Sequence, residues 1–143
     1  MATQFVLIDT NIIVYAINSS SPKHTLAQDF LQSKVGSLVV SHQNIFEAFR
    51  VLTHTQFTKP MTSKDALNAI DAIVQKARVI SPNMTTYHLA IEFVRKYSFS
   101  GDRVFDIYLA ATALSNDIEI IATDNAKDFK DIIEIQIKNP FKH

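Results

Sequence analysis

The sequence predicts an α/β fold, a three-layer sandwich in which a mostly parallel sheet of about five strands carries helices on both faces. Two observations lead to this prediction. Short apolar runs alternate along the chain with longer segments whose apolar residues recur at helical spacing. Strands that alternate with helices form parallel sheets, because each crossover helix returns the chain to the same end of the sheet. The length of 143 residues suits one buried core, so residues 1–143 are expected to form a single domain.

Strands are expected at the short apolar runs, which lie at 5–8, 38–40, 78–80, 119–122 and 133–137. The first run is solidly apolar and ends at Asp9, a pattern that is typical of a strand buried on both faces. The fourth run has the same character and leads into Thr123 and Asp124. The third and last runs are the weaker candidates.

Helices are expected between these strands, at 11–16, 24–34, 43–54, from 62 or 63 to 76, 85–97 and 104–115. Pro22 follows three serines and indicates the entry to the second helix, which Gly36 ends. Lys59-Pro60 marks a break, after which Thr62 or Ser63 can cap the fourth helix. The aromatic residues 46, 49, 57, 93, 97 and 99 are expected to lie for the most part in the core.

The composition excludes several classes of function. The chain has no cysteine, which excludes disulfides, a thiol nucleophile and cysteine-based metal sites. It has only two glycines, which excludes the glycine-rich loops that bind phosphate or dinucleotides. Fourteen basic and fourteen acidic residues give a formal net charge of zero. A nucleic acid would therefore have to be held by a local patch or a bound metal.

The sequence also predicts a cytoplasmic protein with no membrane partner. No stretch approaches the ~18 apolar residues that a membrane helix needs. A secretory signal is not expected, because Asp9 interrupts the only apolar N-terminal run and the first basic residue is Lys23.

Carboxylates from separate elements are expected to meet at one edge of the sheet. Asp9 and Asp124 follow strands directly, and the carboxyl ends of parallel strands are where ligands bind. Glu47 and Asp106 lie in the early turns of helices that begin near the same edge. Taken singly, Asp9 has a structural explanation as a cap or turn residue. Asp106 is expected to lie close to the core, where an unpaired charge is costly. Together they can bind a hard cation such as Mg²⁺ or Mn²⁺, which suits the hydrolysis of phosphodiester bonds.

The ordered motifs carry a family resemblance. They are Leu7-Ile8-Asp9-Thr10-Asn11, Glu47, Phe105-Asp106 followed by Ala110-Ala111-Thr112-Ala113, and Ala122-Thr123-Asp124-Asn125 followed by Asp128-Phe129. This set resembles the PIN-domain ribonucleases over nearly the whole chain, and the closing Asn139-Pro140-Phe141 resembles the end of the VapC toxins of that family. The resemblance implies a PIN-like fold and a Mg²⁺-dependent endoribonuclease. It also implies the toxin of a toxin–antitoxin pair, which forms a homodimer and binds a cognate antitoxin.

The resemblance also implies which residues bind metal and act in catalysis: Asp9, Glu47, Asp106 and Asp124. The fourth acid varies within the family, so Asp128 is the alternative to Asp124.

Mutual repulsion among clustered carboxylates lowers stability in the absence of metal. On this basis the substitution Asp124→Asn is expected to raise the melting temperature of the metal-free protein.

Other residues are candidates for supporting roles. Thr10, Asn11 and Thr123 neighbour the acids and could orient them or hold a metal-bound water. Three basic residues are candidates for contacts with RNA phosphates, although solvated surface charge is the commoner role of such side chains: Arg50, Arg103 and Lys127.

The sequence leaves other functions open. A phosphatase of the HAD type also places an aspartate after the first strand, but it needs a second aspartate at position 11, where this chain has asparagine. A PIN nuclease that processes RNA outside toxin–antitoxin systems is one alternative. A PIN-like module that binds without catalysis is another.

Overall fold

The structure is a computed structural model and describes residues 3–142. The strands are β1 (Val6–Ile8), β2 (Leu38–Ser41), β3 (Arg78–Ile80), β4 (Ile120–Ala122) and β5 (Gln136–Lys138). The α-helices are α1 (Thr10–Ile17), α2 (His24–Ser33), α3 (His42–Thr53), α4 (Ser63–Val74), α5 (Met84–Tyr97) and α6 (Val104–Ser115). Two short 3₁₀ helices, η1 (Gly101–Arg103) and η2 (Ala126–Asp128), lie in loops.

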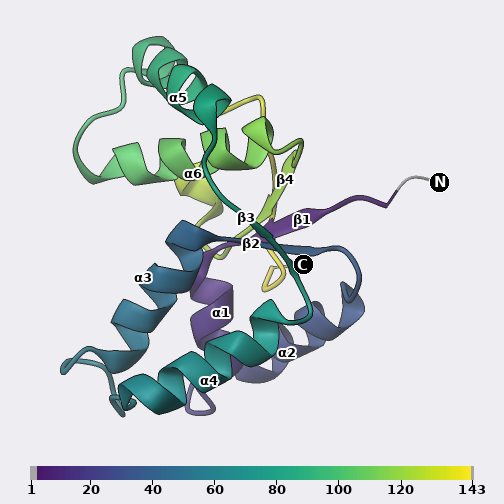
Figure 1. The fold of residues 1–143 in the computed structure, drawn as a ribbon, viewed down its shortest axis with the longest axis vertical. Helices are drawn as coiled ribbons and strands as arrows, with labels where there is room; N and C mark the ends of the chain where they lie inside the picture. The colour runs from purple at the N-terminus through teal and green to yellow at the C-terminus, as the bar shows by residue number, and fades with distance from the viewer. Residues whose placement is uncertain (1–2, 143) are drawn as a thin grey trace.

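All strands pair in parallel in the order β3-β2-β1-β4-β5. The central strand β1 pairs with β2 on one side and with β4 on the other, with Val6 opposite both Leu38 and Ile120. Figure 1 shows the sheet between two groups of helices. The predicted α/β sandwich with a parallel sheet is confirmed.

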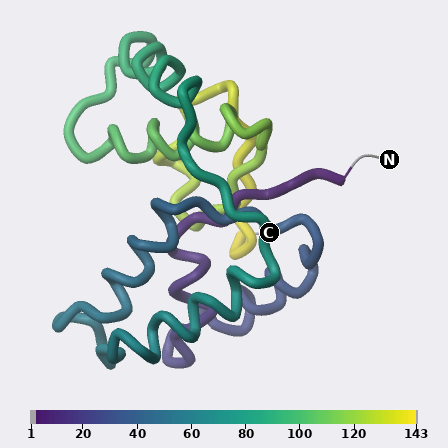
Figure 2. The backbone as a smooth tube through the Cα atoms, viewed as in Figure 1, coloured from purple at the N-terminus to yellow at the C-terminus, as the bar shows by residue number. Residues whose placement is uncertain are grey.

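The solid apolar character of β1 follows from burial on both of its faces. Val6 and Ile8 point into a core formed with helices α1 to α4, whereas Leu7 points into a second core formed with α5 and α6. The tube in Figure 2 shows these two helical layers on opposite sides of the strands. Successive side chains of a strand point to opposite faces, so a strand between two layers has no position left for a polar residue.

The last strand begins later than the sequence predicts, because the predicted segment 133–137 is only partly extended. Ile132 and Ile135 are buried in the second core, but Ile133 between them is 78% exposed. Turns, and not an extended strand, bury Ile132 and Ile135, so pairing with β4 starts only at Gln136. The two 3₁₀ helices were also not predicted.

The aromatic residues lie mostly in or against the core, as expected. Phe93 and Phe99 are buried, and Phe49, Phe57 and Tyr97 pack against the two cores. Phe46 is the exception, with 68% of its surface exposed.

No helix within residues 3–142 has the length and apolarity that crossing a membrane requires.

Candidate active site

The site lies where the strand order of the sheet reverses. From β1 the chain proceeds to β2 on one side, and β4 later adds to the other side. The loops that leave the carboxyl ends of β1 and β4 therefore diverge, and the crevice between them is the usual ligand site of an open parallel sheet. Asp9 follows β1 and Thr123 follows β4, so both lie at this crevice.

Asp9 is held in place by its neighbours on both strands. Its Oδ1 accepts a hydrogen bond from the Thr10 backbone N–H at 2.8 Å, which caps α1, and its Oδ2 accepts one from the Thr123 hydroxyl at 2.8 Å. Burial raises the pKa of Asp9, these two hydrogen bonds oppose the rise, and the charges of Glu47 and Asp128 add to it. The carboxylate is thus fixed but poorly solvated, which favours a nearby cation.

Glu47 approaches Asp9 from α3 through shared partners. The Thr10 hydroxyl donates to Glu47 Oε2 at 2.9 Å, and Gln43 Nε2 donates to Glu47 Oε1 at 3.1 Å. Asn44, fully buried on the same helix, donates to the Thr10 hydroxyl at 3.1 Å and to Asp9 Oδ1 at 3.4 Å. These bonds connect the start of α1 to α3 and orient both acids toward one space.

Asp106 lies in the first turn of α6, on the other side of the crevice. Burial raises its pKa to about 6, and the negative charges of Asp128, Asp9 and Glu47 contribute to that rise, while Arg103 opposes it. Asp106 and Asp9 are therefore influenced electrostatically by each other and by the carboxylates of Glu47 on α3 and Asp128 on η2. Such mutual repulsion is relieved when a cation binds among the acids.

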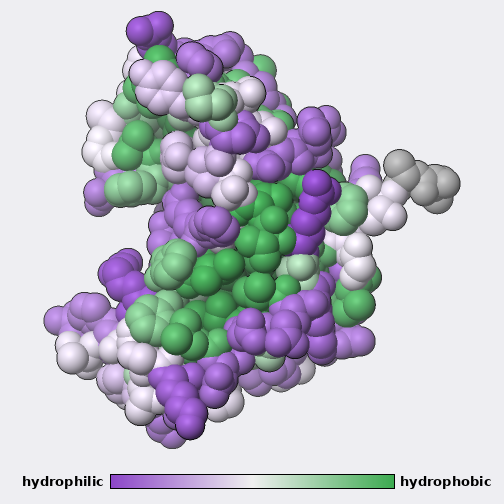
Figure 3. Space-filling view, viewed as in Figure 1, coloured by the Kyte–Doolittle hydropathy of each residue, from purple (hydrophilic) through white to green (hydrophobic). Residues whose placement is uncertain are grey.

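Asp9, Glu47 and Asp106 line one pocket of about 380 Å³. The residues that line it are Asp9, Thr10, Asn11, Val14, Tyr15, Glu47, Val51, Asp106 and Asn125. In the space-filling view a notch separates the part of the molecule that carries α6 from the part that carries α3 (Figure 3). As placed, no three histidine or acidic side chains of residues 3–142 converge closely enough to hold a metal ion. Metal binding would therefore require the side chains of these acids to move closer together.

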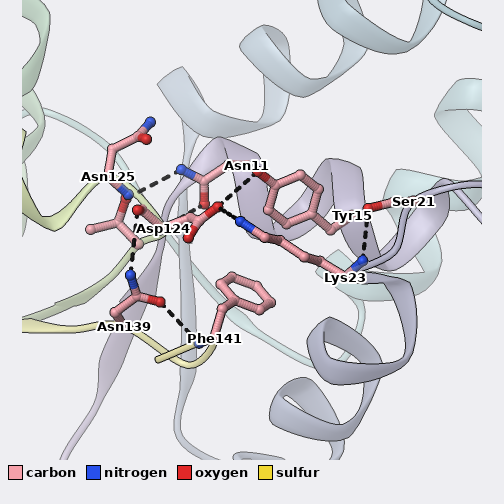
Figure 4. A network of polar contacts seen from close by, with 9 residues as sticks. Asn11, Tyr15, Ser21, Lys23, Asp124, Asn125, Asn139 and Phe141 are labelled. Atoms are coloured by element: carbon pink, nitrogen blue, oxygen red, sulfur yellow. Dashed lines mark hydrogen bonds and ion pairs between the residues drawn. The ribbon is translucent and has the colours of Figure 1, made fainter. Parts of the chain in front are cut away.

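Asp124 does not line this pocket, and its carboxylate contacts Tyr15 and Lys23 (Figure 4). Its Oδ2 accepts a hydrogen bond from the Tyr15 hydroxyl at 2.9 Å and forms an ion pair with Lys23. Burial alone would raise the pKa of Asp124, but the hydrogen bonds from Lys23 and Tyr15 lower it on balance. The Lys23 ammonium also lies 5.4 Å from the ring centres of both Tyr15 and Phe141.

Comparisons with known proteins identify the family and the fold of the chain. Residues 6–134 match the sequence profile described as "PIN domain". The chain belongs to the PIN-domain family. It is 27% identical over 128 residues to "Ribonuclease VapC24" of Mycobacterium tuberculosis, an alignment that covers 87% of this chain and 88% of that protein. The nucleases of this family are metal-dependent in general.

Solved structures of PIN-family toxins have the same fold. VapBC2 from Rickettsia felis, bound to a DNA fragment from its promoter, has a TM-score of 0.71 at 19% identity and covers 95% of this chain and 98% of its own. DNA-bound VapBC from Salmonella typhimurium gives 0.73 at 15% identity, with 96% and 99% covered. VapC20 of M. tuberculosis, a sarcin–ricin loop cleaving toxin, gives 0.63 at 17% identity, with 81% and 86% covered. The predicted relationship to VapC-type PIN proteins is confirmed.

Within this PIN domain, the predicted supporting residues form one chain of hydrogen bonds. Asn11 Nδ2 donates to the Thr123 hydroxyl at 3.2 Å, and Asn11 Oδ1 accepts from the Asp124 backbone N–H at 3.3 Å. Thr123 in turn donates to Asp9. The Thr10 hydroxyl likewise donates a hydrogen bond to the Glu47 carboxylate.

The three basic candidates differ in their surroundings. Arg103 stacks over the ring of Phe99 with its guanidinium 3.7 Å from the ring centre, and it donates to the backbone carbonyl of Asp128 at 3.2 Å. It therefore holds η2 beside the acids in addition to supplying positive charge. Lys127 and Arg50 are exposed, on η2 and α3 respectively.

Sequence reasoning did not single out Gln43, Asn44 or Asn125. Asn125 lines the pocket, and its backbone N–H donates to the Thr123 hydroxyl at 3.0 Å. A sequence signal did exist for Asn44, since it shares a helical stripe with the buried residues Ala48 and Leu52. A polar residue on an apolar stripe must find hydrogen-bond partners, and here they are Ser41, Asp9 and Thr10.

Because of the Lys23–Asp124 ion pair, the effect of Asp124→Asn on stability is expected to be opposite to the one predicted from the sequence. Because the folded-state pKa of Asp124 is lowered, its ionised form stabilises the protein above the ordinary pKa, and that stabilisation is lost as the pH falls through the lowered value. Asp124→Asn is therefore expected to lower the melting temperature at neutral pH. Loss of a partly exposed ion pair costs about 1 kcal/mol, or roughly 2–8 °C in a domain of this size.

Thermal melts of both proteins across a pH series would measure this effect. The wild type and Asp124→Asn should differ at pH 7 and converge in strong acid. Lys23→Gln should destabilise to a similar degree, because it removes the same pair. A variant that melts above the wild type at pH 7 would restore the expectation from sequence.

Proposed function

We propose that this PIN-domain chain is a metal-dependent endoribonuclease that hydrolyses RNA phosphodiester bonds, with Mg²⁺ or Mn²⁺ bound by Asp9, Glu47 and Asp106. The observation that carries the proposal is that these acids, after β1 and on α3 and α6, line one pocket at the reversal of the sheet order. The donor set fits, because carboxylate oxygens are the ligands that such hard cations prefer. The curated relative of the chain is also named a ribonuclease.

The residues of the chain prepare the site in distinct ways. Thr123 and the Thr10 backbone hold Asp9, while the Thr10 hydroxyl and Gln43 hold Glu47. When bound, the metal supplies an activated water and stabilises charge on the phosphate. We propose Asp128 in preference to Asp124 as the fourth acid. The negative charge of Asp128 raises the pKa of both Asp9 and Asp106, whereas the Asp124 carboxylate forms an ion pair with Lys23.

We also propose that the chain is the toxin of a toxin–antitoxin pair, that it acts in the cytoplasm as a homodimer and that a cognate antitoxin binds it. Support comes from the neighbours in fold, which include VapBC complexes from R. felis and S. typhimurium and a toxin–antitoxin complex from Klebsiella pneumoniae. Induced expression should arrest bacterial growth, and co-expression of a small protein encoded next to the gene should restore it.

The direct test is cleavage of RNA by the purified protein. A labelled single-stranded RNA should be cut within its length in the presence of Mg²⁺ or Mn²⁺, and EDTA should stop the reaction. A chain that binds RNA but does not cut it with either ion would be a binding module and would overturn the proposal. A nuclease that cuts but causes no growth arrest would be an RNA-processing enzyme.

The acidic cluster also predicts a pH-dependent effect of metal on stability. The folded-state pKa values of Asp9 and Asp106 are raised, to about 6 for Asp106. An acid whose pKa is raised by folding stabilises the metal-free protein in its protonated form. This stabilisation is complete below the unfolded-state pKa of 3.8 and is lost as the pH rises through the folded-state pKa. A cation that binds the ionised acids restores stability by mass action, by about 2.7 kcal/mol when the free ion is at 100 times its dissociation constant.

Melting curves with EDTA and with excess Mg²⁺ or Mn²⁺, recorded at pH 5 and pH 7.5, would test this prediction. The rise in melting temperature on adding metal should be several degrees at pH 7.5 and smaller at pH 5, where Asp106 is largely protonated. Equal melting temperatures with EDTA and with both metals at pH 7.5 would contradict the metal site.

A further inference from the structure

Exposed aromatic side chains flank the acidic pocket on two helices. Phe46 of α3 is 68% exposed and Phe105 of α6 is 56% exposed. Each directly precedes an acid of the pocket, Glu47 in the first case and Asp106 in the second. Phenylalanine is among the residues most often buried, so two open rings beside one pocket point to a ligand that contacts them.

The two rings belong to parts of the molecule that touch. Gln43, Phe46, Glu47 and Arg50 have the spacing i, i+3, i+4 and i+7, and therefore share one face of α3. From this face Gln43 Nε2 donates both to Glu47 and to the backbone carbonyl of Phe105, at 3.1 and 3.3 Å. The hydrogen bond to the Phe105 carbonyl links the face of α3 that carries Phe46 to the first turn of α6.

On α6, the residues one turn from Phe105 or beside it add to the exposed apolar surface. Tyr108 follows Phe105 by one turn and is 37% exposed, and Val104, one turn before Tyr108, is 40% exposed. Arg50 is exposed on the same face of α3 as Phe46. Exposed aromatic rings therefore lie on both helices next in sequence to Glu47 and Asp106, and Arg50 follows Phe46 by one turn of α3.

An RNA substrate needs this kind of surface, because ionic attraction is weak in this protein. The chain has zero net charge, and the acids of the pocket repel phosphate until a metal binds. Stacking of unpaired bases on aromatic rings provides affinity that does not depend on charge and accepts any base. Bases paired in a duplex are already stacked on each other and are not free to contact the rings.

We propose that Phe46 and Phe105, extended by Tyr108, form a stacking surface for unpaired RNA bases next to the phosphate that is cleaved. The proposal rests on the proposed ribonuclease function and names the side chains of this chain that contact the bases. Bases that lie on the rings place the adjoining phosphate over Asp9, Glu47 and Asp106, and Arg50 is positioned to neutralise a neighbouring phosphate.

The first experiment measures binding without cleavage. Fluorescence anisotropy in EDTA gives the dissociation constants of wild type, Phe46→Leu, Phe105→Leu and the double variant for a labelled single-stranded RNA and for a duplex of the same sequence. Leucine keeps an apolar side chain but removes the aromatic face. Each single substitution is expected to weaken binding of the single strand about tenfold, with little effect on the duplex. Phe105→Tyr should bind as the wild type does.

The second experiment measures cleavage with metal present. Phe46→Leu and Phe105→Leu should raise KM for the single strand about tenfold and leave kcat near the wild-type value, because the acids are untouched. Tyr87→Leu is the matched control and should change neither constant. Tyr87 is 65% exposed at the start of α5, where its neighbour Thr86 contacts Ser115, at the opposite end of α6 from Asp106. Melting temperatures of all variants establish that they are folded.

Three results would overturn the stacking surface. One is an unchanged dissociation constant and KM in the double leucine variant. Another is an equal loss of affinity for single strand and duplex. The third is a fall in molar mass, measured by light scattering, that accompanies the loss of binding, because the rings would then belong to an interface with a second copy of the chain. A wild type that cuts no RNA would defeat the proposed function, whereas the anisotropy experiment would still decide the stacking surface.

Discussion

Replacing Asp106 by asparagine is expected to reduce RNA cleavage at least about 100-fold, the scale on which the loss of one electrostatic group lowers catalysis. Asparagine has the same shape but carries no charge, so it binds a divalent cation poorly. The folded structure should survive, because within residues 3–142 no side chain or backbone donor forms a hydrogen bond to the Asp106 carboxylate. The pKa of about 6 shows that its charge is unfavourable without metal, so the metal-free variant should melt above the wild type.

Initial rates of cleavage over a Mg²⁺ titration, together with melting curves in EDTA, would measure both effects. Asp102→Asn is the matched control, because Asp102 is exposed one helical turn before Asp106 and does not line the pocket. Asp9→Asn should lose cleavage to a similar degree. Wild-type rates for Asp106→Asn at ordinary Mg²⁺ concentrations would remove Asp106 from the proposed metal site.

The second large effect distinguishes the two candidates for the fourth acid. Asp128→Asn is expected to lower kcat at least about tenfold, as the loss of an outer carboxylate at a metal site does. Asp124→Asn should leave kcat near the wild-type value, because the Asp124 carboxylate is bound by Tyr15 and Lys23.

Single-turnover rates of the two variants at saturating metal provide the comparison, since they report the chemical step rather than metal affinity. The charge change is identical and the two positions lie in the same loop, so each variant is the control for the other. A loss of rate in Asp124→Asn that matches or exceeds the loss in Asp128→Asn would return the fourth position to Asp124.

Much of the fold could be predicted because its signals are local. A solid apolar run that ends in a carboxylate indicates a central parallel strand with Asp9 at the ligand edge, and the structure has β1 in this position. The spacing of apolar residues predicts the helices that carry Glu47 and Asp106. The position of β5 could not be predicted, because Ile132 and Ile135 are buried through turns whose geometry depends on the second core.

The orientation of Asp124 was beyond sequence reasoning for a different reason. Its partner Lys23 is 101 residues away, in the turn between α1 and α2. Only the folded chain brings that turn beside Tyr15 and the C-terminal segment with Phe141. The composition places no constraint on which of two carboxylates in one loop meets the other acids and which meets a lysine.

The pairing of β1 with β4 has a consequence for the order in which the chain becomes active during synthesis. Thr123 supports Asp9 across 114 residues of sequence, and Asp106 and Asp128 also come late in the chain. A nascent chain that has emerged only as far as β3 can pair three strands and bring Asp9 near Glu47, but it lacks half of the acidic cluster. Contacts between such distant segments also form slowly. The ribosome that synthesises the protein therefore carries an incomplete site until almost the whole chain has been translated.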